Sequence, residues 1–355
     1  MMATGLSWWQ DVYAFYLITI DILFQKIQCR HLPKRLPLQV SPQLTVIVTG
    51  ATSGIGVEIS GELARAGAHV VLAVRNTKAG KDLVQKWVED QKSKGGRSIN
   101  AEVMELNLLS LASVRAFAKQ WNDRQVPLHV LINNAGIFSI GVTRKFSEDG
   151  YEQHMQVNHL GHALLSLLLL PSLIREAPSR IINVNSDMHH FGFVDPEDMN
   201  LTKRKFSAVA GYGGSKLAQI LFSRILQKQV LQAGVYIVLN HPGEVQTDVV
   251  RTLPKLVQKA KNAILSFLEF SPLEGARVVL FSATDPKIYR YAREMDIQGA
   301  PYISSACRPR KVASYVEDLE YAEKVYNKTL ELVGLPKDYV DQVLGYNTIP
   351  PVDGS

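Results

Sequence analysis

Cysteine is scarce in this chain, with only Cys29 and Cys307 among 355 residues. Because the two lie near opposite ends of the sequence, a disulfide framework is not expected and a reducing compartment is favoured. No Cys/His cluster has metal-ligand spacing, so no metal site is expected, and His189-His190 is interpreted as a surface pair. A Gly-x-Ser-x-Gly elbow is also missing, which argues against hydrolase chemistry.

Long blocks of like charge are missing as well. The net charge is +6 and the pI about 9.1, but the basic residues are scattered and no basic stripe is interleaved with aromatics. Nucleic acid is therefore not an expected partner. No linker rich in Pro, Gly or Ser divides the middle of the chain, which favours one large domain. We expect this domain over residues 41–310, an N-terminal segment over 1–40, and a C-terminal helix and tail over 311–355.

Short apolar runs alternate with helical patterns along the middle of the chain. Strands are expected at Thr45–Thr49, His69–Val74, Asn100–Leu106, Leu128–Ile132, Arg180–Val184 and Val235–Leu239. Helices are expected over Gly54–Ala66, Lys78–Lys94, Leu111–Asn122, Gly150 to about Leu170 (ended by Pro171) and Tyr212–Gln232. This alternation predicts an α/β fold with a single doubly wound (Rossmann) parallel sheet, helices on both faces, and a ligand at the carboxyl ends of the strands.

A glycine-rich turn, Thr49-Gly50-Ala51-Thr52-Ser53-Gly54-Ile55-Gly56, joins the first strand to the first helix. In that context Gly50 allows a tight turn, Gly54 lets the backbone approach a pyrophosphate, and Gly56 permits close helix packing. The helix N-terminus then faces the phosphates. The turn predicts a dinucleotide cofactor.

Arg75 ends the second strand, about 20 residues after Gly56. An acidic residue there would bind the ribose hydroxyls of NAD, whereas an arginine suits a 2′-phosphate. The sequence therefore favours NADP(H) over NAD(H). The alternative is a solvated arginine at a strand end.

Tyr212 and Lys216 are four residues apart, so a helix places phenol and ammonium on one face. We expect the ammonium, together with a positively charged nicotinamide, to lower the phenol pKa from about 10 towards about 7. Ser186 ends a strand and can bind a substrate oxygen in the cleft. Asn158 lies inside a predicted helix, where asparagine is unfavourable, so it either caps an irregularity or serves the site.

These motifs together resemble the short-chain dehydrogenase/reductase family. The resemblance rests on the turn Thr49–Gly56, the segment Asn133–Gly136, Asn158, Ser186, the pair Tyr212 and Lys216, and Pro242-Gly243. It covers about residues 43–305. The segments Ala73–Asn76, Asn158–His162 and Ser215–Ala218 are similar to the retinol-dehydrogenase-like branch, and Gly150–Asn158 and Lys328–Pro336 to a plant oxidoreductase of that branch.

The resemblance implies roles for these residues. Tyr212 would be the general acid–base, Lys216 would lower its pKa and hold the ribose, Ser186 would polarise the carbonyl, and Asn158 would hold a water in a proton relay. It also implies a homodimer through the helices that carry Leu164–Leu170 and Tyr212–Phe222. The cofactor contacts it implies are Thr49, Gly50, Thr52, Ser53, Gly54, Ile55, Gly56, Arg75, Asn76, Asn107, Leu108, Asn134, Ala135, Gly136, Tyr212, Lys216, Pro242, Gly243, Val245 and Thr247.

Three positions depart from the family pattern. Asn107 stands where an aspartate is usual, Asn185 replaces a common serine before Ser186, and Glu244 replaces an apolar residue beside the nicotinamide. A carboxylate at Glu244 could alter cofactor binding or the favoured redox direction.

The N-terminal segment is mostly apolar from Trp8 to Ile27, close to the length that spans a bilayer. Asp21 makes a simple span marginal, and Gln10, Asp21 and Gln25 form a narrow polar stripe. A helix lying in the membrane interface, anchored by its tryptophan pair, fits better. If the helix does span, the basic residues that follow predict that the main domain faces the cytosol, on the endoplasmic reticulum or a similar membrane. The alternative is a helix packed on the protein itself.

Residues of about 248–272 are expected to form a lid with apolar residues at helical spacing. With the N-terminal segment, this favours a lipophilic alcohol or carbonyl substrate, such as a retinoid, steroid or prenol. A rival reading is a non-catalytic NADP(H)-binding regulator that acts through a partner. A sugar-nucleotide epimerase shares the Tyr/Lys pair but needs a larger C-terminal substrate region.

Overall fold

The computed structural model describes residues 8–38, 40–139, 143–203, 206–246, 267–294 and 299–345. Its centre is a sheet of seven strands in the order β3-β2-β1-β4-β5-β6-β7, and every neighbouring pair is parallel. The strands are β1 (Thr45–Thr49), β2 (His69–Val74), β3 (Ala101–Glu105), β4 (Val130–Asn133), β5 (Ser179–Val184), β6 (Val235–Asn240) and β7 (Tyr302–Ile303). Only the short β7 lacks a counterpart in the sequence prediction.

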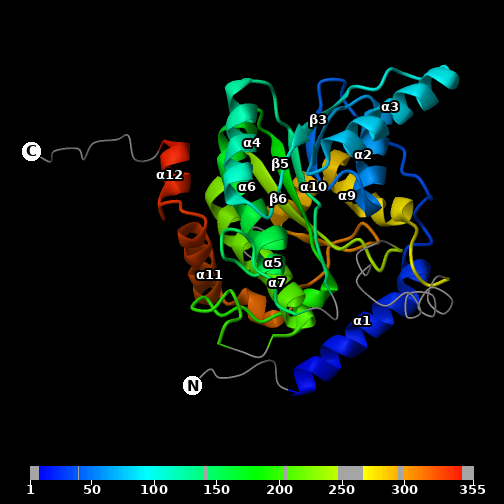
Figure 1. The fold of residues 1–355 in the computed structure, drawn as a ribbon. Helices are drawn as coiled ribbons and strands as arrows, with labels where there is room; N and C mark the ends of the chain where they lie inside the picture. Colours follow the sequence, from blue (N-terminus) through cyan, green and yellow to red (C-terminus); the bar gives the residue numbers. More distant parts are fainter. Residues whose placement is uncertain are drawn as a thin grey trace, which may run out of the picture.

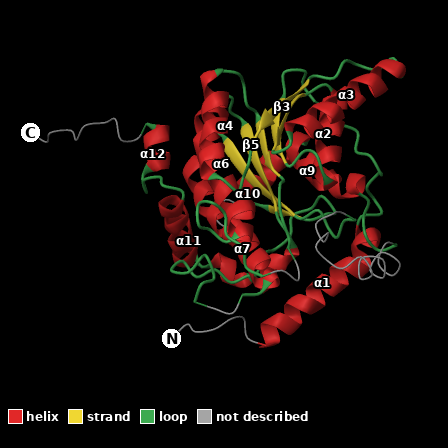
Figure 2. Ribbon diagram, viewed as in Figure 1, coloured by secondary structure: helices red, strands yellow, loops and turns green. Residues whose placement is uncertain are grey.

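Helices cover both faces of the sheet, as Figures 1 and 2 show. One face packs against α2 (Gly54–Ala66), α3 (Thr77–Ser93), α9 (Pro272–Thr284) and α10 (Lys287–Glu294). The other packs against α4 (Leu111–Asp123), α6 (Gly161–Arg175) and α7 (Ala208–Val230). The prediction of a doubly wound sheet is therefore confirmed. Strand residues such as those of β1 and β5 are buried throughout, because helices shield both sides.

The predicted long helix is divided into three pieces. It begins as α5 (Gln153–Met155), passes through a π-helical turn at Gln156–Leu160, and continues as α6. The expectation that Pro171 ends it was wrong, since α6 runs on to Arg175. Asn122 of α4 explains why the helix tolerates Pro171. Its Nδ2 donates to Leu168 O at 2.9 Å, and its Oδ1 accepts from Ser172 Oγ at 2.8 Å. Asn122 therefore supports α6 on both sides of the proline.

The apolar stretch Gln153–Arg175 is long enough to cross a bilayer, but 83% of its most apolar window is buried in the fold. This stretch is a core helix of the layer formed by α4, α6 and α7, because its leucines belong to the same buried hydrophobic cluster as residues of α4 and α7. Length and composition alone do not separate such a helix from a membrane span.

Two C-terminal helices cover the outside of this layer. They are α11 (Leu319–Leu332), packed on α7, and α12 (Tyr339–Leu344), packed on α6. Tyr326 stacks on Phe222 at 5.2 Å between ring centres, and Thr329 hydrogen-bonds His159 at 2.8 Å. A homodimer through these faces of α6 and α7, as the resemblance implied, would have to displace α11.

The N-terminal helix α1 (Trp8–Gln28) lies diagonally below the main body in Figure 1. In the second half of α1, Asp21 and Gln25 are buried against the main domain. The alternative of a helix packed on the protein therefore holds for this half. The side chains of Trp8, Trp9 and Gln10 lie outside the described part of the structure, as does most of the predicted lid (248–266).

Candidate active site

The glycine-rich turn has the geometry of a phosphate cradle. Gly50 and Gly54 have φ of 66° and 54°, values that favour glycine. A Cβ on Gly56 would lie 2.3 Å from Gly50 O, so no other residue fits there. Ser53 is the N-cap of α2, yet its side chain makes no capping hydrogen bond. Gly56 N donates to Ser53 O at 3.2 Å, but no Ser53 side-chain cap covers the N-terminus of α2, so this end can face an anionic ligand and the residues fit a dinucleotide.

Thr49 and Asn134 fasten this turn to the end of β4. The backbone N–H groups of Asn134 and Ala135 both donate to Thr49 Oγ1 at 2.9 Å. Asn134 Nδ2 donates to Thr49 O at 2.9 Å, and His162 Nε2 lies 2.9 Å from Thr49 Oγ1. His162 is buried, and burial lowers its pKa to about 3, so it is a neutral structural partner. Sequence reasoning missed it, because nothing local ties an α6 histidine to β1.

Arg75 lies at the carboxyl end of β2, where a 2′-phosphate would be expected. It is exposed and makes no hydrogen bond or ion pair with any residue in the described ranges. The neighbouring Asn76 instead caps α3, accepting from Ala79 N at 3.0 Å. Asn107 is likewise engaged locally, since its Oδ1 accepts from Leu109 N at 3.1 Å. Of Arg75, Asn76 and Asn107, Arg75 is therefore the one whose side chain no described residue engages.

Tyr212 and Lys216 lie on one face of α7, beside the ends of β4 and β5. Lys216 is buried; its Nζ donates to Val184 O at 2.8 Å and lies 5.7 Å from the centre of the Tyr212 ring. Phe138 stacks on the Tyr212 ring, with ring centres 4.4 Å apart. Ser186 follows β5; its hydroxyl accepts from Met188 N at 3.2 Å, and its side chain acts to lower the pKa of the Tyr212 phenol. The structure therefore brings three of the predicted catalytic residues together.

Asn158, the fourth, lies in the π-helical turn. Its Oδ1 accepts from Ile137 N at 2.9 Å, and its Nδ2 donates to Ile137 O at 3.1 Å and to Ser215 Oγ at 3.0 Å. The side chain thus holds the loop after Gly136 against α7. A helix-interior asparagine does here mark an irregularity, of the kind often found at functional sites. Its role in holding a relay water stays a prediction.

Asn185 explains how Ser186 is held, although sequence analysis noted it only as a departure. Its Oδ1 accepts from Ser186 N at 2.8 Å. Its Nδ2 donates to Lys216 O and Gln219 Oε1, each at 2.9 Å. One amide therefore connects the serine's backbone to the helix that carries Tyr212 and Lys216, which a serine at this position is too short to do.

The electrostatics of the pair differ from the prediction. Burial raises the pKa of Tyr212 above its usual value, Glu244 adds to the rise, and the hydrogen bond with Ser186 opposes it. Burial lowers the pKa of Lys216 to about 8. The prediction assigned the lower phenol pKa to Lys216 and a positively charged nicotinamide acting together; in the protein alone the Lys216 ammonium donates to Val184 O. A further positive charge in the cleft is required.

The loop after β6 closes the site on its other side. Gly243 has φ of 78°, and a Cβ there would lie 2.6 Å from Gln25 Oε1 of α1. Burial raises the pKa of Glu244, with His241 opposing, so the carboxyl group is easier to protonate than usual. Val245 is half-buried and bridges to Phe270. Thr247 lies outside the described residues.

The expected surface pair His189-His190 was interpreted wrongly. His189 is fully buried. Its Nδ1 lies 2.8 Å from Ser186 O, and its ring packs against Tyr302. Asp187, His189 and His190 have potential ligand atoms within 4.8 Å of one another, and so do Asp21, Asp187 and His241. In the second group Arg310 already supplies the positive charge, at 2.7 Å from Asp187 and 3.0 Å from Asp21.

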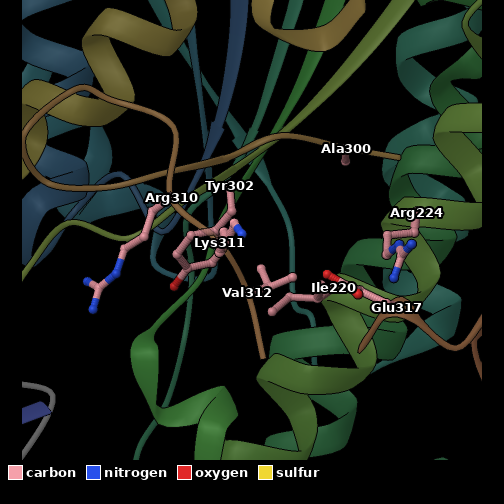
Figure 3. Close-up of a pocket in the computed structure, with 8 residues that line it drawn as sticks. All are labelled: Ile220, Arg224, Ala300, Tyr302, Arg310, Lys311, Val312 and Glu317. Carbon is pink, nitrogen blue, oxygen red and sulfur yellow. The ribbon is translucent and has the colours of Figure 1, made fainter. Parts of the chain in front are cut away.

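A small pocket lies on the far side of α7, between that helix and the chain after β7. Figure 3 shows Arg224 and Glu317 at one end and Arg310 at the other. Its volume is about 20 Å³, enough for a single water. Arg224 Nε and Nη1 have no hydrogen-bond partner in the described part of the chain, so such a water would satisfy them. This pocket is too small for a substrate.

Comparison with known proteins supports what the geometry indicates. The model of the short chain dehydrogenase family matches residues 44–257. The chain belongs to the short-chain dehydrogenase/reductase family. It is therefore an oxidoreductase that acts on CH–OH groups with a nicotinamide cofactor, NAD or NADP, as is typical of this family.

Relatives refine this assignment. The chain is 52% identical to dehydrogenase/reductase SDR family member FEY of Arabidopsis thaliana, over 96% of this chain and 92% of that protein. It is 37% identical to human retinol dehydrogenase 11 (84% and 88% covered) and 34% identical to mouse polyprenol dehydrogenase (91% and 93% covered). A crystal structure of an uncharacterized protein from Mycobacterium paratuberculosis matches with TM-score 0.65 and 30% identity, over 84% and 96% of the two chains. The predicted resemblance to the retinol-dehydrogenase-like branch and its plant member is confirmed.

Proposed function

We propose that the protein is an NADP(H)-dependent oxidoreductase of a lipophilic alcohol or carbonyl compound, with Tyr212 as the general acid–base. The observation that carries this proposal is the convergence of Ser186, Tyr212 and Lys216 at the carboxyl ends of the central strands. Asn185 and Asn158 hold these groups in place, which is the preorganisation that proton transfer requires.

The residues divide the chemistry among them. When bound, the nicotinamide supplies the hydride and, in its oxidised form, the positive charge that Tyr212 lacks. In the reducing direction Tyr212 Oη gives its proton to the carbonyl oxygen as the hydride arrives, and Ser186 Oγ donates a hydrogen bond to the same oxygen. In the oxidising direction Tyr212 accepts the alcohol proton. Phe138 shields one face of the phenol from water.

Arg75 supports the preference for NADP(H), because an exposed guanidinium without a protein partner is free for a phosphate. Arg75→Asp should weaken NADPH binding about 10- to 100-fold, the worth of a charge-assisted hydrogen bond, and should improve NADH binding. Titration of both cofactors by fluorescence measures this. Arg97→Asp, a second exposed arginine, is the control. An unchanged NADPH preference would remove Arg75 from the site.

Two relatives favour an isoprenoid-type substrate. One is named a retinol dehydrogenase and the other a polyprenol dehydrogenase, and both names denote long apolar alcohols. The chain also exposes large apolar side chains close to the cleft. These are Tyr16, Leu23, Phe24 and Ile27 of α1, together with Phe267, and we call them the apolar rim. Lys26 Nζ joins the two parts, donating to Phe267 O at 2.6 Å.

The apolar rim supports a proposal that the protein lies on a membrane, with its catalytic domain in the cytosol on the endoplasmic reticulum or a similar membrane. Because Asp21 is buried in the protein, an interfacial position of α1 fits better than a span. Phe24→Glu/Ile27→Glu should lower the vesicle-bound fraction about tenfold or more in co-flotation with phosphatidylcholine vesicles. Gln28→Ala, on an exposed position of the same helix, should not. Equal binding of all three proteins would count against the proposal.

A turnover screen tests the proposed reaction. Retinoid, prenol and steroid alcohols, and the matching aldehydes and ketones, are offered in detergent or vesicles with NADP⁺ or NADPH. Turnover by wild type that Tyr212→Phe loses supports the enzyme. Cofactor binding without turnover of any compound favours the rival, a regulator that acts through a partner.

A further inference from the structure

The second half of α1 carries the buried side chains of Asp21 and Gln25, and Cys29, the first residue after the helix, continues the four-residue spacing. Asp21, Gln25 and Cys29 are 5%, 0% and 3% exposed, and this spacing puts them on one face of the helix. Gln25 Nε2 donates to Glu244 O at 3.1 Å and to Leu268 O at 2.8 Å, and Glu244 N donates to Gln25 Oε1 at 2.9 Å. This face of α1 is fitted to the catalytic domain, and the apolar rim lies outside it.

Asp21 reaches further into the domain. Its Oδ1 accepts from Arg310 Nη1 at 3.0 Å, and its Oδ2 lies 3.3 Å from His241 Nε2. His241 begins the loop that continues through Pro242, Gly243 and Glu244, so Asp21 and Gln25 hold the two ends of one short segment. That segment follows β6 and borders the cleft.

Arg310 carries the contact on to the catalytic serine. Its Nη1 pairs with Asp187 Oδ2 at 2.7 Å, and the Tyr302 hydroxyl donates to Asp187 Oδ1 at 3.0 Å. Asp187 directly follows Ser186 in the chain, and His241 Nε2 lies 3.6 Å from its Oδ2. Asp21 is therefore two ionic contacts away from the residue next to Ser186, although it belongs to a different part of the sequence.

Asp21 supplies one of the two carboxylates that contact both Arg310 and His241 in this buried group. Burial opposes the charged form of His241, but Asp187 and Asp21 raise its pKa above the ordinary value. Glu244 on its own loop, and His189 and His190 on a neighbouring element, also act on His241, while Arg310 and Tyr302 contact the Asp187 carboxylate beside it. The Asp21 and Asp187 carboxylates each contact both Arg310 and His241. Removing the Asp21 carboxylate takes one contact from each of these two groups, and breaking a buried ion pair is strongly destabilising.

We propose that Asp21 and Gln25 are positioning residues for the active site: α1 holds the Ser186-Asp187 corner and the His241–Glu244 loop in register, and this makes the cleft competent for turnover. The inference rests on the proposed function. Asp21 and Gln25 act through Asp187, His241 and the Glu244 backbone, and neither touches the substrate. The helix that bears the apolar rim thereby also controls the geometry of the reaction.

The test compares Asp21→Asn and Gln25→Ala with Gln28→Ala in the full chain. Because a misplacement of about 1 Å can cost about 100-fold, kcat should fall about 10- to 100-fold in the first two, with little change in KM for the alcohol. Gln28→Ala should match wild type. Hydrogen–deuterium exchange should become faster in peptides covering residues 186–192 and 241–246 of Asp21→Asn and Gln25→Ala alone.

The outcomes are distinct. If Asp21→Asn and Gln25→Ala keep kcat within twofold of Gln28→Ala, α1 is only a cover and the inference is wrong. If Asp21→Asn does not fold, the test rests on Gln25→Ala, which changes no charge. Hydrogen–deuterium exchange of Gln25→Ala that matches wild type in both peptides would then overturn the inference. If wild type turns over no compound, the proposed function fails, and the exchange comparison still decides whether α1 holds the two segments.

Discussion

Tyr212→Phe should lower turnover about 10²- to 10⁴-fold, the usual contribution of a positioned general acid–base. The ring stays, so stacking on Phe138 and the packing of α7 should be kept, and NADPH affinity should change little. Only the proton donor is lost. Steady-state kinetics with a compound found in the screen, together with a fluorescence titration of NADPH, measure the two quantities.

Tyr326→Phe is the matched control. Tyr326 is also a buried tyrosine whose hydroxyl donates a hydrogen bond, to Gln229 Oε1 at 2.7 Å, but it belongs to α11 and lies outside the cleft. Its loss should cost about 1 kcal/mol of stability and leave turnover unchanged. If Tyr212→Phe keeps more than a tenth of wild-type turnover, another group handles the proton.

Lys216→Met should lower turnover about 100-fold and yet make the protein more stable at pH 7. The loss of turnover follows from removing the ammonium beside the phenol and the cofactor. The gain follows from the pKa of Lys216, which burial lowers from 10.5 to about 8. That shift corresponds to at most about 3 kcal/mol by which the charged lysine destabilises the folded wild type. The substitution also removes the stabilising hydrogen bond to Val184 O, which lowers the gain by about 1 kcal/mol. A net gain of about 1–2 kcal/mol remains.

The stability difference between Lys216→Met and wild type should depend on pH. Between pH 8 and 10.5 the unfolded chain binds more protons than the folded chain, so wild-type stability rises with pH through that window. The penalty is fully present below pH 8. The advantage of Lys216→Met should therefore be largest at pH 7 and nearly vanish by pH 10.5, as measured by thermal unfolding. If Lys216→Met is less stable than wild type at both pH values, burial of the Lys216 ammonium does not destabilise the folded protein and the prediction is wrong.

The fold was predictable because its signals are local. Runs such as Thr45–Thr49 are buried on both faces, and the glycine turn after them has to adopt positive φ at Gly50 and Gly54. The Tyr212 and Lys216 pair follows from helical spacing alone. These features depend on residues within one or two turns, which a single sequence displays directly.

The parts that failed depend on contacts across the fold. Burial of the Tyr212 phenol, which raises its pKa in the protein alone, and the bond from Lys216 to the Val184 carbonyl on a neighbouring strand were not visible in the sequence. His189 looked exposed, because nothing nearby in sequence shows that Tyr302 covers it. Asp21 was recognised as unusual in an apolar helix, but its partner Arg310 could not be inferred.

Asp21 and Arg310 are 289 positions apart, which has a consequence for the order of synthesis. At about 5–20 residues per second, a ribosome takes roughly 15–60 s to reach Arg310 after it has made Asp21. During that time α1 has no finished surface on which to bury its polar face. The polar face of α1 can therefore reach its buried place beside the catalytic serine only after the last part of the chain, with Arg310, has emerged.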